Sequence, residues 1–169
     1  MKRSATFAVM SIFFTVCLLM VTAGNTFGEE YSTLKGLKSV KAVFDFELGN
    51  PQMALLHLKV IDQTFKDKNI RAITKKPDIV VIFIGPSVKL VSKNRAGFTA
   101  EDLKILDEYA STISEMSKEG IKFEICLVAA KAFGVEPTSI LSEIKQVGNG
   151  WISLIGHESK GYALVPVNP

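Results

Sequence analysis

The chain has 169 residues, of which 20 are lysine or arginine and 17 are aspartate or glutamate. This near balance of charge excludes the dense basic surface of a nucleic-acid-binding protein. Two cysteines, Cys17 and Cys126, are too few for a fold that depends on several disulfides.

The first 23 residues have the pattern of a secretory signal peptide. The positively charged Lys2 and Arg3 precede an apolar run over residues 5–21, and the small residues Val21-Thr22-Ala23 follow. We therefore expect cleavage of residues 1–23 and a periplasmic or secreted protein. An uncleaved membrane anchor is the alternative, because no charge interrupts the chain before Glu29. Only in that case do we expect contact with a membrane.

The part that follows the leader is nearly neutral and contains about 145 residues, enough for one domain with one core. Without Lys2 and Arg3, 18 basic residues stand against 17 acidic ones. We expect residues 24–39 to form a tether and residues 40–169 to form the domain. Cys126 is then the one remaining cysteine, so no internal disulfide can form.

Strand-like segments alternate with helix-like segments along the predicted domain. The run Ile79–Ile84 is apolar throughout, as is typical of a parallel strand that is covered on both faces. The expected strands are Val40–Phe46, Ile79–Ile84, Ile121–Cys126, Ile144–Val147 and Tyr162–Val165. Five strands that alternate with helices predict a three-layer α/β/α single domain with a mainly parallel sheet.

Capping residues mark the starts of the expected helices. Asn50 and Pro51 suit the N-cap and the first position of a helix that continues to about Lys68. The segment Thr99–Asp102 resembles a capping box at the start of a second helix, which should end before Gly120. Shorter helices are expected at Val128–Phe133 and Trp151–Ser159.

Cys126 ends the third expected strand. In open α/β sheets, ligands bind outside the carboxyl ends of the strands. A helix that starts just after Cys126 would place partial positive charge near the sulfur and stabilise a thiolate, to which Lys131 could add a cation. The loop Gly85-Pro86 should emerge at the same edge, either as an anion-binding loop or as a plain turn. The alternative for Cys126 is an inert, buried, small hydrophobic residue.

Other chemistry has little support in the sequence. His57 and His157 lie far apart, without the ligand spacing of a zinc site, so we expect no metal. Gly148-Asn149-Gly150 lacks the rest of a dinucleotide fingerprint, and we expect no cofactor. The absence of a Cys-x-x-Cys motif excludes a self-contained dithiol oxidoreductase.

The order of several short segments along the chain indicates a family resemblance. They are Ala42-Val43-Phe44-Asp45, Gly49-Asn50-Pro51, Gly85-Pro86, Gly120–Cys126, Val147–Gly150 and Gly161-Tyr162-Ala163. Taken together, over about residues 40–166, they resemble the DsrE/DsrF-like family of sulfur-relay proteins. The resemblance implies a three-layer α/β domain that assembles into homo-oligomers, often trimers or hexamers. It also implies a cysteine that carries sulfur as a persulfide, and Cys126 stands at that position.

We therefore expect an exported, thiol-based sulfur carrier or sulfurtransferase that acts through a persulfide on Cys126. Its partners would be a sulfur donor protein and a sulfur acceptor protein. A non-catalytic, oligomeric binding module with Cys126 buried as a structural residue is the alternative, and the apolar residues Leu127–Ala129 favour it. A metal chaperone that uses Cys126 with a histidine or a methionine is a third hypothesis.

Overall fold

The structure is a computed structural model that describes residues 31–169. The predicted signal peptide and the first part of the predicted tether lie outside these residues. Residues 31–35 contain a short 3-10 turn, Ser32–Leu34. Within the described range, none of the helices combines the length and the apolar character needed to cross a membrane.

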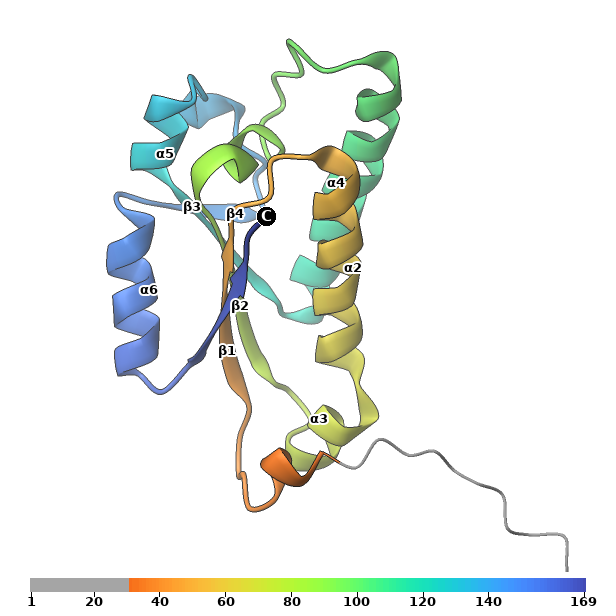
Figure 1. Cartoon of the computed structure of the whole chain (residues 1–169), viewed down its shortest axis with the longest axis vertical. Helices are drawn as coiled ribbons and strands as arrows, with labels where there is room; N and C mark the ends of the chain where they lie inside the picture. Colours follow the sequence, from red (N-terminus) through yellow and green to blue (C-terminus); the bar gives the residue numbers. More distant parts are fainter. Residues whose placement is uncertain (1–30) are drawn as a thin grey trace, which may run out of the picture. The chain divides into compact units, whose positions relative to one another are not determined.

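Residues 36–169 form one compact unit around a five-stranded sheet. The strands are β1 (Lys41–Phe46), β2 (Asp78–Phe83), β3 (Lys122–Cys126), β4 (Ile144–Val147) and β5 (Ala163–Val167). Their order across the sheet is β4-β3-β2-β1-β5, and every neighbouring pair is parallel. The predicted α/β fold with five strands is confirmed, and the sheet is parallel throughout. All the carboxyl ends therefore meet at one edge, the upper one in Figure 1.

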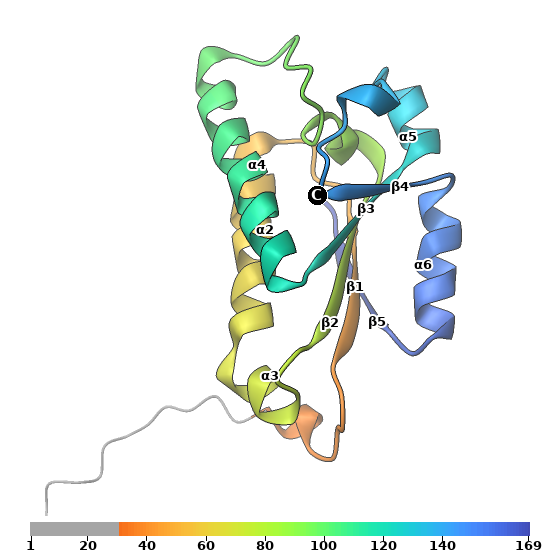
Figure 2. The ribbon, with the colours of Figure 1, turned by 180° about the vertical axis from the view of Figure 1, so that it is seen from behind.

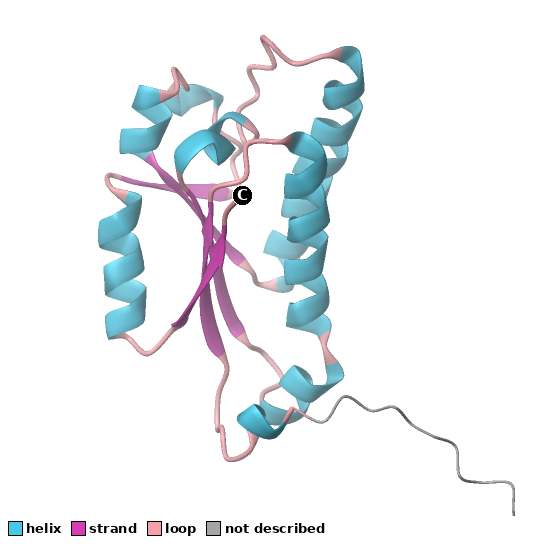
Figure 3. Cartoon of the chain, viewed as in Figure 1, coloured by secondary structure: helices cyan, strands magenta, loops and turns pink. Residues whose placement is uncertain are grey.

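Helices cover both faces of the sheet. They are α2 (Pro51–Lys66), α3 (Lys68–Ile73), α4 (Ala100–Glu119), α5 (Leu127–Ala132) and α6 (Gly150–Ser159). The long helices α2 and α4 lie on one side and α6 lies on the other, as Figures 1 and 2 show from opposite directions. The magenta strands of Figure 3 thus form the middle of three layers.

The helix boundaries follow from local hydrogen bonds. The Asn50 side chain accepts the Met53 N–H at 2.9 Å, and Thr99 and Asp102 form the predicted capping box. Gly120 ends α4 with a φ of 111°, a conformation that favours glycine. The short helix α3 was not predicted, and it begins because Asp67 caps the N–H groups of the residues that follow it.

Aromatic rings fill the space between the sheet and the pair α2 and α4. The fully buried Phe83 lies between Phe46 and Phe123, with ring centroids 5.5 and 6.0 Å away, and Tyr109 of α4 lies 6.4 Å away. Because side chains alternate along a strand, the neighbours of these residues point to the other face, toward α6.

Strand β5 forms one edge of the sheet and contains a proline, Pro166. The adjacent Val167 carbonyl accepts the Glu47 N–H of the chain just after β1 at 2.8 Å. Since successive residues of a strand direct their backbone groups to opposite sides, the Pro166 nitrogen faces the open edge.

Candidate functional site

Cys126 is the last residue of β3 and the N-cap residue of α5. Its sulfur accepts a hydrogen bond from the Ala129 N–H at 3.4 Å. The sequence therefore placed this thiol correctly at the carboxyl edge of a parallel sheet and at the start of a helix. Lys131 is exposed in the last turn of α5, and the donor nearest the sulfur comes from the backbone instead.

The Cys126 side chain is covered, with only 4% of the residue exposed. Part of the cover is the first turn of α6. A Cβ atom added to Gly150 would come within 2.9 Å of the Cys126 Cβ and within 2.8 Å of the Ile84 Cδ1. Only glycine fits at this point, because its missing side chain lets α6 approach the sheet at the cysteine.

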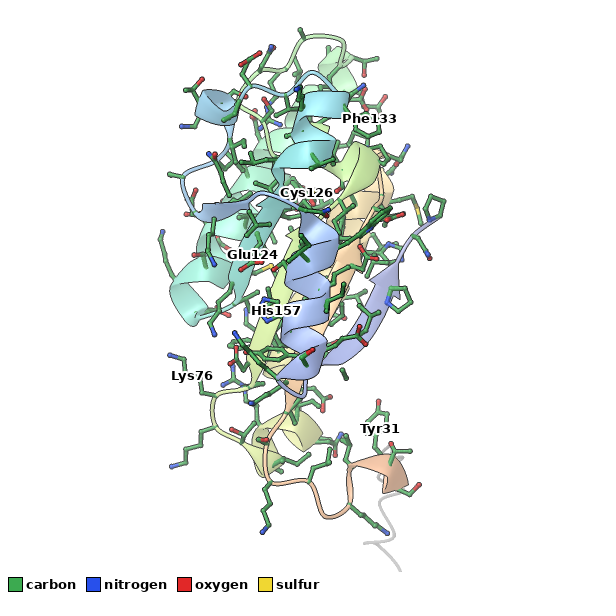
Figure 4. All side chains as sticks on the ribbon, turned by 90° about the vertical axis from the view of Figure 1, so that its left-hand side faces the viewer. Tyr31, Lys76, Glu124, Cys126, Phe133 and His157 are labelled. Atoms are coloured by element: carbon green, nitrogen blue, oxygen red, sulfur yellow. The ribbon has the colours of Figure 1, made fainter. Side chains whose placement is uncertain are left out.

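A buried carboxylate lies on the same face of β3, two residues before the cysteine. Glu124 is 7% exposed, and its Oε2 accepts a hydrogen bond from the Ser153 hydroxyl of α6. His157 Nε2 of α6 lies 3.7 Å from the same oxygen, and Lys145 Nζ of β4 lies 3.3 Å from Oε1. Figure 4 shows Cys126, Glu124 and His157 one below the other beside or on α6.

A second cluster of polar side chains lies near the C-terminal end of α6 and is centred on Asp78. The Tyr162 hydroxyl donates to Asp78 Oδ2 at 2.6 Å, and Lys122 Nζ donates to Oδ1 at 2.8 Å. Burial opposes ionisation of Asp78, but these two hydrogen bonds outweigh it and lower the pKa of the carboxyl group. Burial and the bond to Asp78 raise the pKa of Tyr162 to about 12. The His157 ring packs edge-on against Tyr162, with centroids 4.8 Å apart, and so connects the two groups.

Asp45 of β1 lies on this face as well, in register with Ile82 and hence with Glu124. Its Oδ1 is buried and has no hydrogen-bond partner within residues 31–169. Burial, together with repulsion from Glu47, raises the pKa of this carboxyl group. The ionised side chain is therefore a local cost to the fold.

The two histidines are not brought together. His57 lies on α2, across the sheet from α6, with its Nδ1 2.9 Å from the Met53 carbonyl oxygen. His157 contacts Glu124. Among residues 31–169, no group of three histidine, cysteine or acidic side chains is close enough to hold a metal ion.

A hollow of about 240 Å³ lies beside the end of α5, and Cys126 does not line it. Its lining includes Lys89, Asn94, Phe98 and Phe133. The loop Gly85-Pro86 opens a 3-10 turn, Gly85–Lys89, which packs beside α5. This loop therefore connects β2 to a 3-10 turn, and the hydrogen bond to the Cys126 sulfur comes from Ala129 of α5.

The cluster of Glu124 with Ser153 and His157 was missed in the sequence. One signal was available: Glu124 is a charged residue inside an otherwise apolar stretch, Phe123–Cys126. A strand period of two places Glu124 and Cys126 on one face. Its partners on α6 could not be identified, because they depend on how that helix packs against the sheet.

Comparison with known proteins gives a family and a fold. The model of the DsrE/DsrF-like family matches residues 49–167. A protein of unknown function from Methanobacterium thermoautotrophicum, MTH1491, has a similar structure, with a TM-score of 0.60 and 17% identity over 76% of this chain and 99% of that chain. The ychN protein from E. coli gives a TM-score of 0.50 and 9% identity, over 77% of this chain and 99% of that chain.

These two structural likenesses show the fold alone, since the identities are low. No curated protein matches the sequence. The family model, however, extends over well more than half of the chain, from the turn after β1 to the last strand. The chain therefore belongs to the DsrE/DsrF-like family, as its resemblance to that family predicted.

Proposed function

We propose that this protein is a thiol-based sulfur carrier in which Cys126 holds the transferred sulfur as a persulfide. One observation carries the proposal: a backbone N–H, that of Ala129, points at the sulfur of Cys126 at 3.4 Å, at the carboxyl edge of the sheet. A cysteine sulfur at such a position is suited to bearing negative charge, and the thiolate is the form that reacts. Membership of the DsrE/DsrF-like family supports the same chemistry.

The proposed transfer conserves electrons. The Cys126 thiolate attacks the outer sulfur of a donor persulfide, and a new sulfur–sulfur bond forms as the bond to the inner donor sulfur breaks. The donor leaves as a thiolate with the electron pair of that bond. An acceptor thiolate then attacks the outer sulfur on Cys126, takes it, and returns Cys126 to the thiolate form. The exchange requires no cofactor and no external oxidant.

Incubation of the full chain with polysulfide, followed by mass analysis of the peptide that contains Cys126, tests this proposal. We expect one or more added sulfur atoms on that peptide, which dithiothreitol removes. Cys126→Ser is the matched control and should carry none. The proposal is wrong if the wild-type peptide gains no sulfur, or if the serine variant gains as much.

We further propose that the carrier is exported and assembles into a homo-oligomer. Exposed apolar side chains on α2 support assembly: they are Met53, Leu56 and Val60. Light scattering coupled to gel filtration should give the mass of a trimer or a hexamer, and a monomer at micromolar concentration would contradict assembly. The apolar leader supports export, which fractionation of the producing cells with a cytoplasmic marker tests.

A second candidate function is supported by the 4% exposure of Cys126. In this alternative the protein is an oligomeric binding module, and the cysteine only packs in its core. The thiol would then react with iodoacetamide only as fast as the whole protein unfolds. Labelling that is much faster than global unfolding would exclude this alternative.

A further inference from the structure

Helix α6 is attached to the sheet by few apolar contacts. Of its ten residues, only Gly150 and Leu154 are buried, whereas α2 buries six of its sixteen. Three large apolar side chains of α6, those of Trp151, Ile152 and Ile155, are exposed. Segments with few buried apolar contacts open at a lower free-energy cost than the rest of a domain.

Polar contacts compensate in part for this thin packing. The Ser153 hydroxyl donates to the buried Glu124 carboxylate, and His157 lies beside the same oxygen. A hydrogen bond to a charged acceptor is stronger than one between neutral groups. The hydrogen bond between Ser153 and Glu124 therefore holds α6 against the sheet. It lies about one helical turn from Gly150, the residue of α6 that covers Cys126.

Glycines flank this helix on both sides. Gly148 precedes it in open space, and Gly161 follows it with a φ of 82°. Each lacks the side chain that would restrict its backbone torsions. The chain can thus change direction at either end of α6 while the strands β4 and β5 stay in the sheet.

From this geometry we propose that α6 is a movable cover over Cys126, held closed by the hydrogen bond between Ser153 and Glu124. The proposal rests on the proposed sulfur carrier, since a carrier must bring a donor sulfur into contact with a thiol that is covered in the closed structure. Opening of α6 exposes the sulfur to a donor or an acceptor, and closing of α6 covers the free thiol between transfers. Glu124 and Ser153 are then positioning residues that set the fraction of open molecules.

The rate of alkylation of Cys126 in the folded full chain tests the cover directly. Labelling by iodoacetamide at constant pH is followed on the peptide that contains Cys126, so that Cys17 does not contribute. In Ser153→Ala we expect labelling about tenfold faster than in the wild type, the effect of losing one hydrogen bond to a charged group. Ser159→Ala is the matched control, because within residues 31–169 the Ser159 hydroxyl bonds only to the Ile155 carbonyl of its own helix.

Two further measurements separate the cover from general loosening of the fold. Glu124→Gln should also accelerate labelling, and Glu124→Gln combined with Ser153→Ala should accelerate it less than the product of the two single effects. The labelling rate should depend on urea much more weakly than global unfolding does, because lifting one helix exposes little surface. Equal rates in Ser153→Ala and Ser159→Ala, or a urea dependence equal to that of global unfolding, would overturn the proposal.

Two glycines of α6 give a second matched pair. In Gly150→Ala the new Cβ would overlap Cys126 and Ile84, so the first turn of α6 must move outward and labelling should accelerate. In Gly156→Ala the added Cβ has open space, and labelling should be no faster than in the wild type. A faster rate in Gly156→Ala than in Gly150→Ala would contradict a cover that closes at Gly150.

The persulfide assay distinguishes failure of the cover from failure of the carrier. If the carrier proposal fails, polysulfide leaves no adduct on Cys126 even in Ser153→Ala, although alkylation is accelerated. If only the cover fails, Cys126 gains sulfur at the same rate in the wild type, in Ser153→Ala and in Ser159→Ala.

Discussion

The two faces of the sheet are built in different ways. The face toward α2 and α4 is sealed by aromatic rings around Phe83 and by long helices with regular apolar positions. The face toward α6 carries Glu124, Asp78 and Asp45 on its strands, beneath or beside a ten-residue helix. One face thus supplies most of the apolar burial, and the other holds the ionisable groups and the thiol.

The thiol and the ionisable groups lie on the face that contributes less to the stability of the domain. Burial of apolar surface is the main favourable term in folding, so a face that supplies little of it can change shape without unfolding the domain. Charged side chains, in contrast, need specific partners when they are buried. The α6 face is consequently the more polar, the more easily opened, and the one on which Cys126 lies.

Truncation of a core side chain on each face should give the largest difference. Phe83→Ala removes a fully buried ring from the α2 and α4 face and should cost about 4 kcal/mol of unfolding free energy, whereas Leu154→Ala of α6 should cost about 2 kcal/mol. Urea unfolding followed by circular dichroism measures both. A cost of Leu154→Ala that equals that of Phe83→Ala would remove the distinction between the faces.

Removing the hydroxyl of one tyrosine on each face should give a smaller difference in stability between the faces. Tyr162→Phe loses the hydrogen bond to Asp78 and should cost about 1 kcal/mol at pH 7. Tyr109→Phe should be neutral or stabilising, because the Tyr109 hydroxyl is buried and has no hydrogen-bond partner within residues 31–169. Urea unfolding of the two variants should therefore give changes of different size, and equal losses would contradict the assignment.

The cost of Tyr162→Phe should also depend on pH. The pKa of Tyr162 is raised from 10.0 to about 12 in the folded protein. The stabilisation that depends on the protonated hydroxyl is therefore complete below pH 10 and is lost as the pH rises toward 12. The difference in stability between the wild type and Tyr162→Phe should shrink over this interval, and a constant difference would argue against the bond to Asp78.

Asp45→Asn should stabilise the protein slightly, by no more than about 1 kcal/mol at pH 7, since the carboxyl group is only partly buried. The pKa of Asp45 is raised above 3.8, so the folded state carries a penalty when this group is ionised. That penalty is present above the raised pKa and absent below pH 3.8, where the group is protonated in both states. Unfolding curves of both proteins at pH 7 and at pH 3 should diverge only at pH 7.

The smallest effect is expected for an exposed ion pair on the α2 and α4 face. Lys59 of α2 pairs with Glu108 of α4, and both side chains are about half exposed. Lys59→Met should change the unfolding free energy by less than about 0.5 kcal/mol, because water and salt screen such pairs. A loss above 1 kcal/mol would show that this face, too, depends on charge.

Local patterns predicted most of the fold. The apolar run Ile79–Ile84 corresponds to β2, with a shift of one residue, because a strand covered on both faces needs uninterrupted apolar residues. The capping box at Thr99 and the glycine at position 120 set the limits of α4. Helix α3 was missed because its six residues are too few to show a period, although Asp67 is a recognisable cap.

Only the part of the site that depends on position along the chain could be predicted from the sequence. The place of Cys126 follows from the end of a strand, so the sequence indicated it. Its cover does not follow, because Gly150 reaches Cys126 through the packing of a distant helix. For the same reason the pairing of Glu124 with His157 was not found, since it depends on the angle at which α6 crosses the sheet.

The proline at position 166 limits how copies of this protein can meet. An additional strand laid along β5 would find no N–H donor at Pro166, where its backbone ladder would need one. On the opposite side, β4 is only four residues long and carries the exposed Lys145. Growth of the sheet from one molecule into the next is therefore disfavoured at both borders, and the proposed oligomer would have to form through side chains outside the sheet edges.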